Sequence, residues 1–173
     1  MKEFILGLDV STSRVGITIL NSNADLIDCQ VIKLNSKDEL EIRCDQLKKY
    51  LQLNYNIYYI KEIYIESPFV MFSGGKTTAM TMAKLQRFNG MVCYMVRDLY
   101  GITAASIAAN KARGLIGLKI KRGENTKLKV IEWVQNEYPN DFIVEYTRYG
   151  NPKPGTDDKA DSVVIARAGL LIE

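Results

Sequence analysis

The segment Phe4–Asp9 (FILGLD) is an apolar run that ends in a carboxylate, which indicates a core strand with an acidic residue at its end. A second apolar run, Ile63–Glu66 (IYIE), ends in the same way. Asp158 and Asp161 follow much later, three residues apart, at the expected start of a C-terminal helix. Burying an ionised carboxylate is costly unless a positive charge compensates it. Carboxylates in several elements that can converge therefore favour a site for divalent cations.

Side-chain alternation along the two expected strands allows their carboxylates to meet. Alternation places Asp9 on the same face as Gly7, and it places Glu66 on the same face as Tyr64. If the two strands are neighbours in the sheet, Asp9 and Glu66 can approach each other at its edge.

The C-terminal carboxylates share one face of the expected helix, one turn apart. Asp158 lies in the first turn, where the helix dipole favours an anion, and Thr156 is the expected N-cap. Asp161 lies inside an apolar stripe, where an unpaired charge has no structural explanation. Asp157 would share a face with Asp161 as well, so whether Asp157 or Asp158 is the ligand stays open.

Oxygen-only ligands suit Mg²⁺ or Mn²⁺ better than zinc. Such a cluster can hold two ions about 4 Å apart, one activating a water and the other stabilising the leaving oxygen of a phosphodiester. The chain has no histidine, which excludes imidazole-ligated zinc sites and histidine general bases. Its three cysteines lack metal-ligand or redox spacing and are expected to be free thiols in a reducing compartment: Cys29, Cys44 and Cys93.

Length and composition predict one domain over residues 1–173 with a substantial core. The apolar fraction of 47% is ordinary for a soluble protein. The sequence has no apolar stretch long enough to span a membrane and no signal peptide. The protein is therefore expected in the cytoplasm, or in the host cytoplasm if the source is a virus.

The predicted elements follow the order βββαβαβαα, which fits one α/β layer with a mixed sheet. Three antiparallel strands come first and parallel crossovers follow. The long second helix carries apolar residues on more than one face, which is consistent with a dimerisation surface. The expected strands are 3–10, 14–21, 25–34, 60–66 and 102–108, and the expected helices are 37–55, 76–100, 125–137 and 157–172. The alanines of 102–108 also permit a helix there.

Net charge is only +3, but basic residues concentrate in 111–129 against a single acid, Glu124. This run fits a surface that contacts phosphates, and the alternative is a solvated face. Its basic members are Lys111, Arg113, Lys119, Lys121, Arg122, Lys127 and Lys129.

Three motifs of the chain resemble those of the RuvC-type Holliday junction resolvases, in order and spacing. Ile5–Gly16 (ILGLDVSTSRVG) resembles their first motif, Ile65–Phe69 (IESPF) their second, and Asp158–Ala166 (DKADSVVIA) their C-terminal helix. The resemblance implies an RNase H-like fold, a mixed five-stranded sheet flanked by helices, a homodimer, and paired nicks in four-way or branched DNA during recombination and repair. It also implies a set of metal ligands for Mg²⁺ or Mn²⁺: Asp9, Glu66, Asp158 and Asp161.

The same resemblance assigns roles to residues outside the carboxylates. Lys127 is the best match to a basic residue near the scissile phosphate, with Lys111 or Arg113 as a second. Phe69 matches an aromatic that stacks at the junction centre, and Phe72 lies close by, although each could equally be a core residue. Further expected DNA contacts are Lys119, Lys121 and Arg122.

Two departures from the family pattern stand out. Ser162 replaces a small apolar residue after the last aspartate. The stretch 140–156 is longer than in typical bacterial members, which indicates a phage-type branch with a broader range of branched substrates. The related alternatives are an RNase H-like nuclease acting on structured RNA and a non-catalytic junction-binding protein.

Nucleotide binding is not expected. Ser73–Thr77 (SGGKT) resembles the end of a P-loop, but Val70 stands where the first glycine is required. Lys76 in a glycine-rich loop is expected to touch a DNA phosphate instead. The opening motif also resembles the phosphate-binding strands of sugar kinases and actin-like ATPases, but those proteins need a second such domain.

Overall fold

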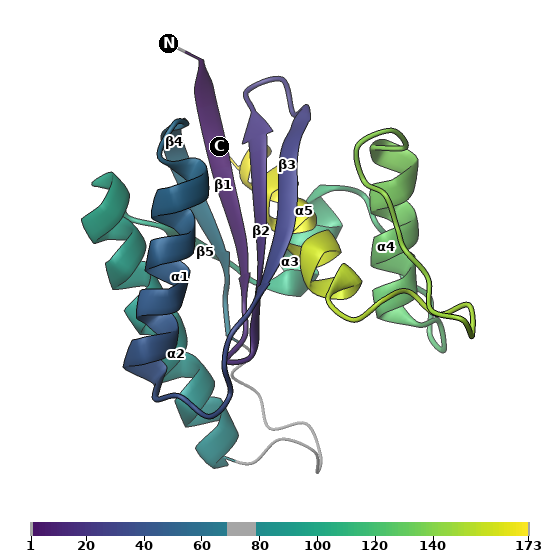
Figure 1. Cartoon of the computed structure of the whole chain (residues 1–173). Helices are drawn as coiled ribbons and strands as arrows, with labels where there is room; N and C mark the ends of the chain where they lie inside the picture. Colours follow the sequence, from purple (N-terminus) through teal and green to yellow (C-terminus); the bar gives the residue numbers. More distant parts are fainter. Residues whose placement is uncertain (1, 69–78, 173) are drawn as a thin grey trace.

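The computed structural model describes residues 2–68 and 79–172 and forms a mixed sheet with helices on both faces (Figure 1). The five strands lie in the order β3-β2-β1-β4-β5. The first three are antiparallel, and β4 and β5 continue the sheet parallel to β1, as the sequence predicts. The strands are β1 (Glu3–Val10), β2 (Arg14–Asn21), β3 (Leu26–Lys33), β4 (Tyr59–Glu66) and β5 (Ala105–Ile107).

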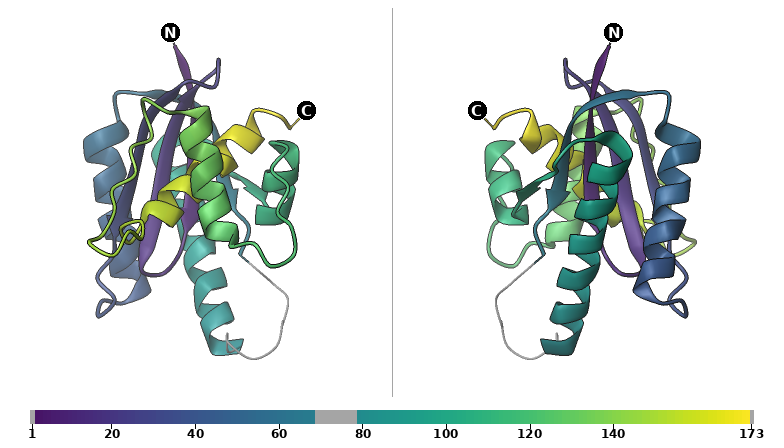
Figure 2. Two further views of the ribbon diagram at one scale, coloured as in Figure 1. Left: turned by 90° about the vertical axis from the view of Figure 1, so that its right-hand side faces the viewer. Right: turned by 90° about the vertical axis from the view of Figure 1, so that its left-hand side faces the viewer.

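Two helices, α1 (Leu40–Tyr55) and α2 (Ala79–Tyr100), pack against each other on one face of the sheet. The C-terminal helix α5 (Thr156–Gly169) covers the opposite face, and α3 (Ala109–Leu115) and α4 (Thr126–Glu137) pack on α5 (Figures 1 and 2). No helix among the described residues is long and apolar enough to cross a membrane.

Helix α3 lies in a segment, 109–124, for which the sequence predicts neither a strand nor a helix. The segment 102–108 was expected as a strand, but only Ala105–Ile107 pairs with β4. The alanine-rich residues that follow form a short helix instead, because alanine has the highest helix propensity and Gly117, at a φ of +75°, ends the turn.

Side chains alternate along the strands as expected, so the sheet has one hydrophobic core on each face. Leu6 and Leu8 of β1 are fully buried beneath α1 and α2, together with Phe88 of α2. Ile5 faces the other side and packs against the apolar face of α5. Because both faces of the central strands are covered, β1 is apolar along almost its whole length until it reaches Asp9.

Two glycines let α5 lie unusually close to the sheet. A Cβ at Gly7 would lie 2.6 Å from Cβ of Ala166, and a Cβ at Gly16 would lie 2.0 Å from the carbonyl oxygen of Asp158. Gly16 is also the residue that pairs with Asp9 across the β1–β2 ladder. The close approach therefore places the first turn of α5 directly over the strand end that carries Asp9.

The start of α5 differs by one residue from the prediction. Gly155, at a φ of +94°, is the N-cap, and Thr156 is already the first helical residue. The Thr156 hydroxyl donates to the carbonyl of Lys153 at 2.7 Å instead of capping the helix. A glycine occupies the cap because the chain turns into the helix through a left-handed conformation that other residues rarely adopt.

Candidate active site

The carboxylates that the sequence singles out gather at one end of the sheet. β1 and β4 are parallel neighbours, with Leu8 paired to Ile65, so their carboxyl ends lie side by side. Asp9 follows Leu8 directly, and Glu66 is the last residue of β4. The condition under which Asp9 and Glu66 can approach each other is therefore met.

Asp9 is the group on which all the other carboxylates act. Burial raises its pKa well above the usual value, and the negative charges of Glu66, Asp161, Asp158 and Asp157 raise it further. Carboxylates from β1, β4 and α5 therefore act on one another electrostatically and make a single acidic cluster.

Glu66 and Asp161 are shifted for the same two reasons. Burial, followed by the charge of Asp161, raises the pKa of Glu66 to about 7. Burial raises the pKa of Asp161 to about 6, with smaller contributions from Asp157 and Asp158. The guanidinium of Arg113, from α3, opposes both shifts and is the cation that faces this pair.

Asp157 and Asp158 have different environments although they are adjacent in the chain. Asp157 contacts the ammonium of Lys127, and this contact lowers the Asp157 pKa despite the opposing effect of burial. Burial and the charge of Asp157 raise the pKa of Asp158, against Arg14 and Lys127. Oδ2 of Asp158 is buried and has no hydrogen-bond partner among the described residues. Asp157 is thus engaged by a lysine, whereas Asp158 has an unpartnered oxygen.

The chemistry of these groups fits a hard divalent cation. The donor atoms are all oxygens, which suits Mg²⁺ or Mn²⁺, and the unpartnered oxygen of Asp158 lacks the compensation that a buried carboxylate requires. Within residues 2–68 and 79–172, no three acidic or cysteine side chains are already close enough to form a complete cation site. Uncompensated carboxylates repel one another, so a bound cation would favour their closer approach.

The predicted basic residues lie in three different environments. Arg113 and Lys127 lie beside the carboxylates, and the Lys127 side chain is 70% exposed. Lys119 and Lys121 instead line a hollow of about 230 Å³ together with Trp133. Lys111 and Arg122 are exposed. The predicted contacts Phe69, Phe72 and Lys76 lie outside the described residues.

Three supporting residues escaped the sequence analysis. Arg14 begins β2 and its charge lowers the pKa of Asp158. The amide of Asn89, a buried polar residue in α2, donates to the carbonyl of Glu66 at 3.1 Å. Arg43 is buried in α1 and donates to the carbonyl of Thr12 at 2.6 Å, which holds the turn after Asp9. Asn89 and Arg43 could have been identified from the sequence, because each is a polar residue within an otherwise apolar helical stripe.

Sheet order, the helix arrangement and the acidic end of β1 and β4 together define an RNase H-like α/β domain. Thermus thermophilus RuvC in complex with a Holliday junction substrate has the same fold, with a TM-score of 0.68 and 13% identity over 96% of this chain and 91% of that one. The yeast mitochondrial Holliday junction resolvase Ydc2 superposes with a TM-score of 0.60 and 16% identity, covering 96% of this chain and 77% of that one.

The resemblance to RuvC-type resolvases is thereby confirmed at the level of the fold. No protein-family model and no curated protein matches the sequence. At 13% and 16% identity, the likeness to solved structures establishes the RNase H-like fold, and the activity has to be argued from the site.

Proposed function

We propose that this chain is a metal-dependent endonuclease that resolves Holliday junctions or related branched DNA, in recombination and repair, by paired phosphodiester nicks. One observation carries the proposal: Asp9, Glu66 and the α5 carboxylates form one acidic cluster at the carboxyl end of β1 and β4. The chain shares its fold with RuvC bound to a Holliday junction substrate, which supports this substrate class.

The proposed metal ligands are the four carboxylates of the cluster. Two Mg²⁺ or Mn²⁺ ions would supply an activated water and stabilise the leaving oxygen when bound. Asp158 is preferred over Asp157 because Asp157 already has a lysine partner while Oδ2 of Asp158 has none among the described residues. The proposed ligands are Asp9, Glu66, Asp158 and Asp161.

Lys127 and Arg113 are proposed to hold the phosphate at this site. Lys127 projects from the first turn of α4 and is largely exposed, so its ammonium can exchange Asp157 for a phosphate oxygen. The charge of Arg113 acts on both Glu66 and Asp161, so Arg113 adds a second cation to the cluster. Further backbone contacts are proposed for Lys111, Lys119, Lys121 and Arg122, and the stacking and phosphate roles of Phe69, Phe72 and Lys76 remain predictions.

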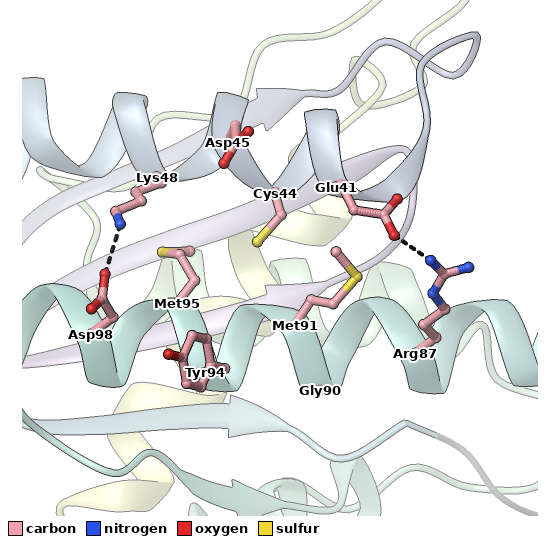
Figure 3. Close-up of a pocket in the computed structure, with 10 residues that line it drawn as sticks. All are labelled: Glu41, Cys44, Asp45, Lys48, Arg87, Gly90, Met91, Tyr94, Met95 and Asp98. Atoms are coloured by element: carbon pink, nitrogen blue, oxygen red, sulfur yellow. Dashed lines mark hydrogen bonds and ion pairs between the residues drawn. The ribbon is translucent and has the colours of Figure 1, made fainter.

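Paired nicks require two active sites, and we propose that the groove between α1 and α2 binds a second copy of the chain. The groove has a volume of about 580 Å³ and an apolar floor that includes Cys44, Met91 and Met95 (Figure 3). Ion pairs join the two helices at its ends, Lys48 to Asp98 at 2.7 Å and Arg87 to Glu41. Tyr94 lines the groove and is 75% exposed, which is unusual for a large aromatic ring.

The direct test compares a labelled four-way junction with a linear duplex of matched sequence in the presence of Mg²⁺, Mn²⁺ or a chelator. We expect metal-dependent, near-symmetric nicks confined to the junction. Asp161→Asn should abolish these nicks while junction binding persists, because it removes a proposed ligand but leaves the basic surface intact.

The other outcomes of this assay identify the alternatives. Junction binding without cutting by the wild-type protein would indicate a non-catalytic junction-binding protein. Cutting of a structured RNA, run in parallel, in preference to the junction would indicate a ribonuclease of the same fold. Retained cutting by Asp161→Asn would refute the metal-ligand assignment.

A further inference from the structure

The chain between α4 and α5 contains a hairpin with a defined shape, which we call the 145–153 hairpin. Tyr146 and Pro152 form an antiparallel bridge. Its tip is a tight turn that ends at Gly150, which has a φ of +78°. Three backbone hydrogen bonds close the hairpin: Thr147 N to Asn151 O at 2.7 Å, Lys153 N to Glu145 O at 2.9 Å, and Gly150 N to Thr147 O at 3.0 Å.

The tip displays an aromatic ring and a cation together. Tyr149 is 74% exposed, and the guanidinium carbon of Arg148 lies 4.5 Å from the centroid of its ring. Arg148 also contacts the Tyr149 hydroxyl, so the two side chains form one unit. Tyr146, lower on the hairpin, is 53% exposed. A single exposed tyrosine is ordinary, but here an ordered hairpin presents a tyrosine ring and an arginine cation side by side at its tip.

The hairpin is tied directly to the first turn of α5. The amide of Thr156 donates to the carbonyl of Lys153 at 3.1 Å, and the Thr156 hydroxyl donates to the same oxygen. Asp157 and Asp158 come next in the chain. Figures 1 and 2 show the connection between α4 and α5 projecting beside the start of α5. The hairpin therefore adjoins the start of α5 on the side of β3, whose Gln30 and Val31 line a hollow with Lys153 and Gly155.

The charge around the hairpin favours a polyanion. Residues 146–156 include Arg148 and Lys153 but no acidic residue. A hollow of about 350 Å³ beside the hairpin is lined by Lys153 and Lys159, with Glu145 as its acidic member. Glu145, the acidic residue that precedes the stretch, is paired with Lys153 at 3.1 Å. Arg148 at the tip and Lys159 on α5 are therefore the cations of this surface that have no acidic partner among the described residues.

We propose that the 145–153 hairpin binds a strand of the branched DNA beside the start of α5, with Tyr149 stacking on an unpaired base and Arg148 contacting a phosphate. This inference rests on the proposed function, and it names an element that recognises unpaired bases at a branch. One face of the Tyr149 ring is covered by Arg148, and the large exposure of the ring leaves the other face for a base. Stacking accepts any base, so the contact selects branched DNA without reading its sequence.

The test uses the full-length protein with a chelator, so that binding is measured without cutting. The probes are a branched DNA with 2-aminopurine at an unpaired position beside the branch and a fully paired duplex of matched sequence. We expect Tyr149→Ala to weaken binding to the branched DNA about tenfold, to change duplex binding little, and to abolish the change in 2-aminopurine fluorescence. Tyr149→Phe, which keeps the ring, should behave like the wild-type protein.

Three results would overturn the proposal. Tyr149→Ala could bind the branched DNA with wild-type affinity and fluorescence, or it could weaken branched and duplex binding equally. In either case junction cutting by the wild-type protein would leave the proposed function intact. A wild-type protein that neither binds nor cuts branched DNA would refute both. Because Tyr149 is exposed, its substitution is not expected to affect folding, and equal melting temperatures would verify this.

Discussion

At the scale of single residues, Asp161 shows how the acidic cluster opposes folding in the absence of a cation. Its pKa rises from 3.8 to about 6, mainly through burial. A carboxyl with a raised folded-state pKa contributes stability below its unfolded pKa, and this contribution is lost as pH rises through the folded value. The metal-free protein should therefore lose stability between about pH 4 and pH 7, with Glu66, whose pKa is about 7, acting in the same direction.

The first prediction isolates this effect with Asp161→Asn. In the presence of a chelator, the variant should be more stable than the wild-type protein at pH 8, by roughly 1–3 kcal/mol, because the buried charge is gone. At pH 4 the advantage should disappear, since Asp161 is then protonated. Denaturant unfolding at both pH values measures the difference. An equal difference at the two pH values would contradict the explanation.

The second prediction concerns Lys127, which contacts Asp157 across the entrance to the cluster. Lys127→Ala should slow single-turnover junction cutting on the order of 100-fold, because a cation facing the scissile phosphate is lost. Junction binding should change little. Lys129→Ala is the matched control, since Lys129 lies on the same helix but is paired with Glu132 at 2.9 Å. An equal loss of cutting rate in the two variants would show that Lys127 makes only a general contact with DNA phosphates.

At the scale of elements, the contact between α5 and the sheet positions the proposed metal ligands. The third prediction is that Gly16→Ala destabilises the protein by about 1–3 kcal/mol, because its Cβ would lie 2.0 Å from the carbonyl oxygen of Asp158. The helix must shift to relieve this clash, so junction cutting should fall as well. Gly114→Ala, in α3, is the control: its Cβ would have no neighbour within 4 Å, so stability should rise slightly. Unchanged stability of Gly16→Ala would contradict the close approach.

The sequence predicts most accurately those elements whose apolar residues form a run with clear ends. Strands β1 and β2 have the bounds expected from the sequence, because their apolar runs end at a carboxylate and a short polar turn. Helix α3 was missed because a short alanine-rich segment between glycines has no periodicity to distinguish it from a loop. Ser162 is fully buried, and its hydroxyl is 2.7 Å from the hydroxyl of Thr18 in a hydrogen bond between α5 and the sheet. The sequence does not predict this pair, because the two residues are far apart in the chain.

At the scale of the whole molecule, the sequence could place the carboxylates at one end of the sheet but could not distinguish Asp157 from Asp158. Parallel strands end at the same edge, so Asp9 and Glu66 were predictable from their positions alone. The different environments of the two α5 carboxylates depend on Lys127 and Arg14, which come from distant segments. Such differences require the packing of α4 and β2 around α5.

The fourth prediction concerns the proposed binding of a second copy of the chain at the α1–α2 groove. Tyr94→Asp places a charge at the groove, so it should convert a dimer into a monomer in sedimentation measurements. A monomer has one acidic cluster, so on a plasmid with an extruded cruciform it should give nicked circles, whereas the wild-type dimer should give linear product. Ile57→Asp is the control, because Ile57 is 80% exposed just after α1 and does not line the groove. A wild-type protein that sediments as a monomer and still linearises the plasmid would show that paired nicks do not depend on this groove.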